Sequence, residues 1–133
     1  MLSYFKFHHI GIAVFDIDST AKYYISAGYS KTNTVYDPVQ NVYISFLTKD
    51  GMPKIELLAP KDETSPVNKI LKKNGVMPYH FCYEVDEINQ AIADLKKLHF
   101  VLINMPVRAL AIENKKICFL FNKDVGLIEL LEE

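Results

Sequence analysis

The feature that most constrains this chain is an internal repeat that runs through almost all of its 133 residues. The segment HHIGIAVFDIDSTAKYYISAGY, residues 8–29, aligns without a gap with YHFCYEVDEINQAIADLKKLHF, residues 79–100. Each copy begins as an alternating strand and continues, after acidic residues typical of a helix start, as an amphipathic helix. Later in the chain KIELLAP, residues 54–60, matches LIELLEE, residues 127–133. The sequence therefore predicts two copies of one small α+β unit.

The repeat predicts a single domain of two tandem βαβββ modules, about residues 5–60 and about residues 77–133. The expected strands lie near residues 7–14, 30–37, 41–48 and 53–59, and then near 78–85, 100–105, 115–121 and 126–131.

A helical linker of about residues 64–75 is expected to join the two modules. Ser65 is suited to cap this helix, Pro66 suits its first position, and Gly75 suits the residue just past its end.

The composition excludes several classes of protein. Fifteen basic residues against sixteen acidic ones give a formal net charge of −1, so no basic field for nucleic acid or for an anionic membrane is present. No apolar run approaches the roughly 20 residues needed to span a bilayer, and the first residues lack the pattern of a signal peptide. A cytoplasmic protein is expected. Cys82 and Cys118 lie in apolar strand-like segments and are expected to be core thiols.

The repeat also places chemically active residues at equivalent positions. His9 matches His80 in the first strand of each module, and Glu56 matches Glu129 in the last. Any one of these residues alone has an ordinary structural explanation, as a core histidine or an outward-facing charge. Four matched positions point instead to a divalent cation, because imidazole and carboxylate groups are ligands for Zn²⁺, Ni²⁺, Co²⁺, Mn²⁺ and Fe²⁺.

Four segments carry a family resemblance: HHIGIAV, KIELLAP, PYHFCYEVD and GLIELLE. They resemble the signature segments of the vicinal oxygen chelate (glyoxalase/bleomycin resistance/dioxygenase) superfamily, most closely its methylmalonyl-CoA epimerase and glyoxalase I-like branch. The resemblance implies paired βαβββ modules that form a curved mixed sheet around a central metal cavity. It also implies one divalent metal ion, Zn, Ni, Co, Mn or Fe, with the ligands His9, Glu56, His80 and Glu129.

The resemblance implies a metal-dependent epimerase or isomerase that moves a proton next to a carbonyl, through a metal-chelated enolate and with Glu129 as a catalytic group. The substrate would be an acyl-CoA thioester. A glyoxalase I (lactoylglutathione lyase)-like enzyme acting on a glutathione hemithioacetal is one alternative, and a non-catalytic small-molecule binding or resistance protein is another. A homodimer is left open.

The sequence departs from the epimerase pattern in one turn. Epimerases commonly have PEQGV before the third strand, with a glutamate that acts as a base, but Val39 stands at that position in DPVQNVYISF, residues 37–46. Asp37 would point to the same side as Val39 if the segment were extended, so we expect it to supply the second catalytic group. The alternative is that Asp37 only opens an Asp-Pro turn.

A second departure lies before the seventh expected strand, in PVRALAIENKKICFL, residues 106–120. The family often has a glycine-rich loop and paired lysines there, and this chain keeps only the lysines. Arg108, Lys115 and Lys116 could meet an anionic substrate tail, or they could be ordinary solvated surface charges.

Overall fold

A computed structural model describes residues 1–133, with three α-helices and ten β-strands. The chain forms two compact units, and the boundaries between them fall inside two strands. One unit is His9–Tyr79, called the N-terminal unit below, and the other combines Met1–His8 with His80–Glu133 and is called the C-terminal unit. Helices and mixed strand pairings occur in both units, so the predicted α+β class is confirmed.

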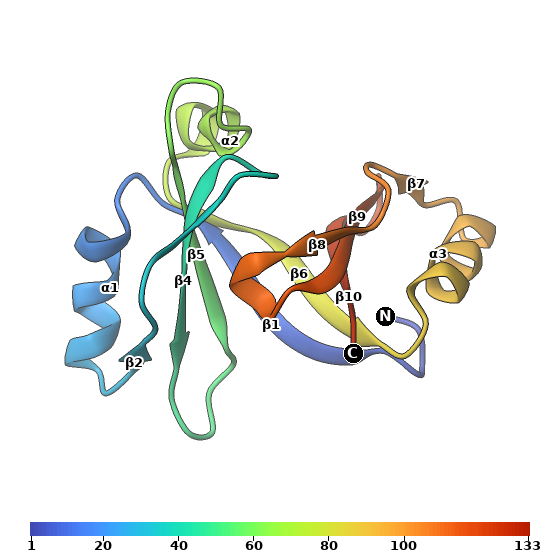
Figure 1. Cartoon of the computed structure of the whole chain (residues 1–133), viewed down its shortest axis with the longest axis horizontal. Coiled ribbons are helices and arrows are strands. Elements are labelled where there is room, and N and C mark those ends of the chain that lie inside the picture. The colour runs from blue at the N-terminus through green and yellow to red at the C-terminus, as the bar shows by residue number, and fades with distance from the viewer. The chain divides into compact units, whose positions relative to one another are not determined.

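The N-terminal unit contains two helices and most of five strands, which are coloured blue to green in Figure 1. Its strands pair in the order β2-β4-β5-β1, with β3 beside β4, and β1 runs parallel to β5. In chain order the elements are β1 (Lys6–Ala13), α1 (Ile17–Ser26), β2 (Ser30–Lys31), β3 (Val35–Asp37), β4 (Val42–Thr48), β5 (Ile55–Pro60) and α2 (Val67–Asn74).

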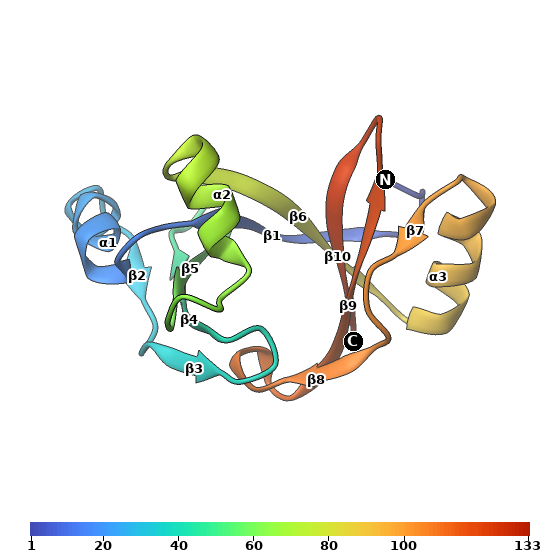
Figure 2. The ribbon, with the colours of Figure 1, turned by 90° about the horizontal axis from the view of Figure 1, so that it is seen from above.

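The C-terminal unit repeats this arrangement, with β6-β10-β9-β7 in order, β8 beside β9, and β6 parallel to β10. Figure 2 shows α3 next to β7. The elements are β6 (Met77–Val85), α3 (Ile88–Lys97), β7 (Val101–Leu102), β8 (Val107–Ala109), a 3₁₀ turn (Leu110–Ile112), β9 (Lys115–Asn122) and β10 (Gly126–Glu132).

Each unit has a hydrophobic core between one face of its strands and one helix, which is α1 in the N-terminal unit and α3 in the C-terminal unit. Successive side chains of a strand point to opposite faces. In the N-terminal unit Ile55 and Leu57 of β5 therefore pack with residues of α1. In the C-terminal unit Ile128 and Leu130 of β10 pack with residues of α3 in the same way. Glu56 and Glu129 are thereby directed to the strand face opposite the helix.

Two expected strands are interrupted in the structure, which corrects the predicted boundaries. The strand expected over residues 30–37 divides into β2 and β3, and the strand expected over residues 100–105 is reduced to β7, with β8 following it. At each interruption a side chain replaces the backbone acceptor. Thr32 Oγ1 accepts the N–H of Phe46, and Asn104 Oδ1 accepts the N–H of Phe119, both at 2.9 Å.

The helix ends follow the expectation in two places and depart from it in a third. Asp16 caps α1 through a bond from the Ser19 N–H to Oδ2 (2.9 Å), and Gly75 ends α2 with a φ of 74°. The expected side-chain cap at Ser65 is wrong, because its hydroxyl accepts the N–H groups of Lys61 and Asp62 in the preceding loop instead. None of the three helices combines the length and the apolar character needed to cross a bilayer, and the cytoplasmic location stays a prediction.

Candidate metal centre

The first predicted pair of site residues meets in the N-terminal unit. His9 lies on β1 and Glu56 on the neighbouring β5, where Gly11 pairs with Glu56. Because His9 is two residues before Gly11, both side chains occupy the same face of the sheet. His9 Nε2 lies 3.2 Å from Glu56 Oε1, and the two residues are only 0% and 1% exposed.

The second pair meets in the C-terminal unit with the same geometry. His80 lies on β6 and Glu129 on β10, where Cys82 pairs with Glu129. His80 Nε2 lies 3.2 Å from Glu129 Oε1, and the two residues are 3% and 1% exposed. Each unit therefore holds one buried imidazole–carboxylate pair, at positions that the sequence repeat matches.

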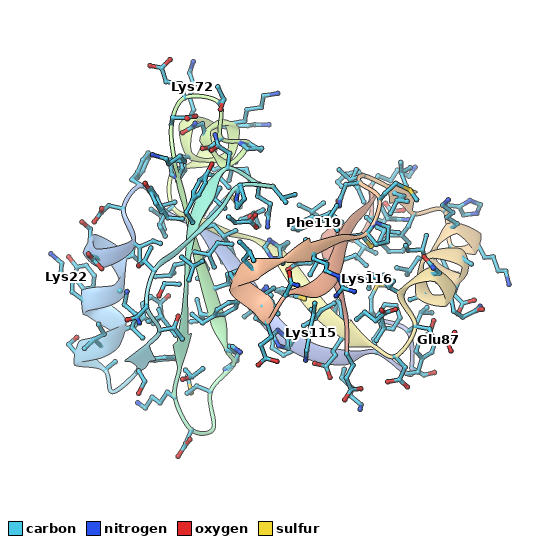
Figure 3. All side chains as sticks on the ribbon, viewed as in Figure 1. Lys22, Lys72, Glu87, Lys115, Lys116 and Phe119 are labelled. Carbon is cyan, nitrogen blue, oxygen red and sulfur yellow. The ribbon has the colours of Figure 1, made fainter.

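A phenylalanine supports each histidine. Phe46 on β4 pairs with Glu56, and its ring meets the His9 ring edge to face at 5.4 Å between centroids. Phe119 on β9, which Figure 3 labels, pairs with Glu129, and its ring meets His80 at 5.3 Å. These ring contacts limit the orientations that the imidazoles can take.

Each pair fits two ligands of one divalent ion. Metal–ligand bonds of about 2.1 Å place neighbouring donor atoms about 3.0–3.4 Å apart in tetrahedral or octahedral geometry. The 3.2 Å separation in both pairs lies in this interval. A buried carboxylate has a large desolvation penalty, which a bound cation offsets. The donor types suit Zn²⁺, Ni²⁺, Co²⁺, Mn²⁺ or Fe²⁺.

Two side chains that the sequence pattern did not identify hold the two phenylalanines in place. Thr32 and Asn104 receive the N–H groups of Phe46 and Phe119, while Phe46 O and Phe119 O accept from the N–H groups of Thr32 and Ile103. The only signal in the sequence is a polar residue at the same stage of each repeat, after the helix and before the next strand. Such residues bond to local backbone groups and commonly interrupt strands.

Asp37 is buried, and its carboxylate binds the turn that follows β3. Oδ1 accepts the N–H of Val39 at 2.9 Å and of Gln40 at 3.4 Å, and Oδ2 accepts from the Gln40 side-chain amide at 3.0 Å. The segment is not extended, since residues 38–41 form a turn and Val39 is 57% exposed. The premise that Asp37 and Val39 share one side of a strand is therefore wrong, whereas the catalytic role of Asp37 stays a prediction.

Two of the three basic side chains in residues 106–120 make local contacts. Arg108 on β8 donates to the carbonyl of Asn114 (2.9 Å), and Lys115 lies 3.7 Å from the exposed Glu113 carboxylate. Figure 3 shows Lys115 and Lys116 near the start of β9. Glu113 and Asn114 have φ values of 54° and 59°, a conformation that favours glycine. The backbone thus keeps a tight turn although the expected glycines are missing.

The cysteines lie in the core, as predicted. Neither Cys82 nor Cys118 forms a disulfide, and both are buried. Burial raises the pKa of the Cys118 thiol to about 12, and the nearby Glu129 carboxylate contributes to this rise. Cys118 is therefore a protonated thiol at neutral pH rather than a nucleophile.

Comparison with known proteins gives the family of this chain. Residues 8–119 match the model of the glyoxalase/bleomycin resistance protein/dioxygenase superfamily. The chain belongs to this superfamily. The match includes His9, Glu56 and His80, and the resemblance found in the sequence is confirmed.

Three similar members of the glyoxalase superfamily are epimerases. The chain is 36% identical over 130 residues to the mitochondrial methylmalonyl-CoA epimerase of Homo sapiens, covering 94% of this chain and 72% of that protein. A crystal structure of methylmalonyl-CoA epimerase from Mycobacterium tuberculosis superposes with a TM-score of 0.87 at 28% identity, covering 99% and 91% of the two chains. A methylmalonyl-CoA epimerase in complex with methylmalonyl-CoA and NH₄⁺ superposes with a TM-score of 0.84 at 30% identity, covering 98% and 96%. These relatives are enzymes, and the predicted enzyme class of epimerase or isomerase is confirmed.

Proposed function

We propose that this protein is a metal-dependent epimerase that inverts the carbon between a thioester carbonyl and a carboxylate, with methylmalonyl-CoA as its substrate. The observation that carries the proposal is the buried His–Glu pair that occurs in both units, at matched positions of the repeat. The names of the relatives supply the reaction and the substrate.

In this proposal His9, Glu56, His80 and Glu129 hold one divalent ion. The ion, when bound, polarises the thioester carbonyl and stabilises the negative charge that develops when the neighbouring proton leaves. The imidazoles act as neutral donors, with ring orientations limited by Phe46 and Phe119. Glu129 would also carry the proton on one face of the reacting carbon, because a carboxylate can serve as a metal ligand or as an acid or base.

Inversion by two groups requires a second acid or base on the opposite face. Asp37 is our candidate, because Val39 cannot move a proton and Asp37 is the nearest carboxylate in sequence. Three hydrogen bonds from the turn fix the position of its carboxylate. The same bonds also serve the turn alone, so the role of Asp37 requires a direct test.

Exchange of the substrate α-proton with D₂O tests the proposed function. Metal-loaded protein is incubated with methylmalonyl-CoA and, in parallel, with the hemithioacetal of methylglyoxal and glutathione, and deuterium incorporation is followed by mass spectrometry. We expect exchange with methylmalonyl-CoA and a loss of at least about 100-fold in Asp37→Asn. Turnover of the hemithioacetal alone would favour a glyoxalase I-like enzyme, and binding without turnover of either substrate would favour a binding protein.

If Asp37→Asn left the exchange rate unchanged while Glu129→Gln abolished it, a single base or a water would replace Asp37 in the mechanism. Asp50→Asn, on the exposed turn between β4 and β5, is the matched control for the loss of one carboxylate.

A further inference from the structure

The two units differ in the residue that lies beside the site histidine. In the N-terminal unit Ile10 pairs with Ile55, and the Ile10 N–H donates to the Lys54 carbonyl at 3.0 Å. Lys54 immediately precedes β5, and extending the β1–β5 register by one residue places it opposite His9, with neighbouring strands about 4.8 Å apart. In the C-terminal unit Phe81 pairs with Ile128, which places Leu127 opposite His80. An ammonium group in one repeat is therefore replaced by an apolar side chain in the other.

Lys54 is directed to the face that carries the His–Glu pair. It is two residues before Glu56, so the two side chains point to the same side of the strand. Its Nζ lies 4.7 Å from the centroid of the Phe46 ring, which is the ring that contacts His9. Lys54 is half-buried and takes part in no ion pair. The cation is thus held beside the site while its charge remains available to an anion.

The charge balance of the proposed metal centre suggests a role for the Lys54 ammonium group. Two glutamates balance the charge of a divalent ion, so a substrate carboxylate brought to the centre adds a negative charge that a neighbouring cation can balance. A malonyl-type thioester differs from a simple acyl thioester by one carboxylate on the reacting carbon. A lysine next to a metal-ligating histidine can pair with that carboxylate, and a charge-assisted hydrogen bond is about twice as strong as a neutral one.

We propose that Lys54 binds the free carboxylate of the substrate and thereby selects malonyl-type thioesters over acyl thioesters that lack it. This inference rests on the proposed function for the class of substrate. Lys54 would act by binding and orienting the substrate, and no proton transfer is assigned to it.

The test measures binding and not turnover. Affinities of malonyl-CoA and propionyl-CoA for the metal-loaded protein are compared by isothermal titration calorimetry, for wild type, Lys54→Met and Lys54→Arg. The methionine keeps the length and the contact with Phe46 but removes the charge. We expect Lys54→Met to weaken malonyl-CoA binding by about 10- to 100-fold while propionyl-CoA binding changes less than about twofold. Lys54→Arg is expected to restore most of the malonyl-CoA affinity.

The matched control is Lys22→Met. Lys22 lies on the outside of α1, and its Nζ is 5.2 Å from the Tyr23 ring centroid, so the same substitution removes a similar cation–π contact away from β5 (Figure 3). If Lys54→Met weakened the affinity for malonyl-CoA and for propionyl-CoA equally, the proposal would be overturned. Lys54 would then contact the CoA portion that the two ligands share. Unchanged affinity for malonyl-CoA would also overturn it. A wild-type protein that binds malonyl-CoA but does not exchange methylmalonyl-CoA would instead count against the proposed function alone.

Discussion

The two units have the same His–Glu geometry but different surroundings for it. In both, Nε2 and Oε1 lie 3.2 Å apart, and a phenylalanine contacts the imidazole edge to face. The surroundings of the pairs differ: Lys54 corresponds to Leu127 in the repeat and Gly11 to Cys82. The acceptor for the phenylalanine N–H is a threonine in one unit and an asparagine in the other. Strand pairing therefore fixes the geometry of each His–Glu pair, whereas the residues around the pair differ between the units.

The largest expected effect comes from removing either histidine. If the two pairs contribute equally to one metal, His9→Ala and His80→Ala should each reduce metal affinity by more than about 100-fold, since each removes one ligand. Metal content after chelator-free purification and competition titration measure this. His99→Asn, at an exposed loop histidine with a φ of 67°, is the control and should keep the metal. Retention of full metal content in either alanine variant would contradict a centre shared by both units.

The next largest effect is a difference in exchange rate between the glutamine variants of Glu129 and Glu56. Glu129→Gln is expected to lower the exchange rate by about 10²- to 10⁴-fold, because an amide cannot carry the proton. Glu56→Gln should lower it by less than about 10-fold, because the amide oxygen can still coordinate the ion. Metal content is measured alongside, so that loss of the ion is not mistaken for loss of the proton carrier. Equal rate losses with the metal retained would mean that the units do not divide the roles as proposed.

A smaller effect is expected from the side chains that receive the phenylalanine N–H groups. Thr32→Val and Asn104→Ala should each lower the free energy of unfolding by about 1–2 kcal/mol, since each leaves a backbone donor without its acceptor. Thr32→Ser and Asn104→Asp keep an acceptor oxygen and should recover most of the loss. Urea denaturation gives the values, with Thr48→Val at the exposed end of β4 as control. Losses confined to one unit would show that the two interruptions are not equivalent.

The smallest expected effect concerns the turns before β4 and β9. Asn41 and Asn114 stand at matched positions with φ values of 53° and 59°, but only the second is preceded by another left-handed residue, Glu113. Left-handed backbone costs a glutamate about 1–2 kcal/mol, partly offset by the larger entropy loss of glycine on folding. Glu113→Gly should therefore raise the free energy of unfolding by about 0.5–1 kcal/mol, as measured by thermal and urea denaturation. Asn114→Gly should change it by less, because asparagine tolerates this conformation, and a destabilising Glu113→Gly would contradict the strain argument.

The repeat, the α+β class and the candidate metal ligands all follow from the order of the residues in the chain. They could be predicted because side chains alternate with a period of two in a strand and of 3.6 in a helix, and because the two halves of the chain match at His9 and His80 and at Glu56 and Glu129. The helix end at Gly75 was also predictable, because it depends on the conformational freedom of one residue.

The neighbours of each candidate ligand depend on how the strands pair in the folded chain. The distance between His9 and Glu56 depends on the register of β1 against β5, two strands more than 40 residues apart in the chain. The same register puts Lys54 opposite His9. The interruptions at Thr32 and Asn104, and the loop contacts of Ser65, likewise depend on backbone groups that come close only after folding. Local periodicity specifies which face a side chain takes, but long-range pairing specifies its neighbours, and the chemistry of this protein depends on those neighbours.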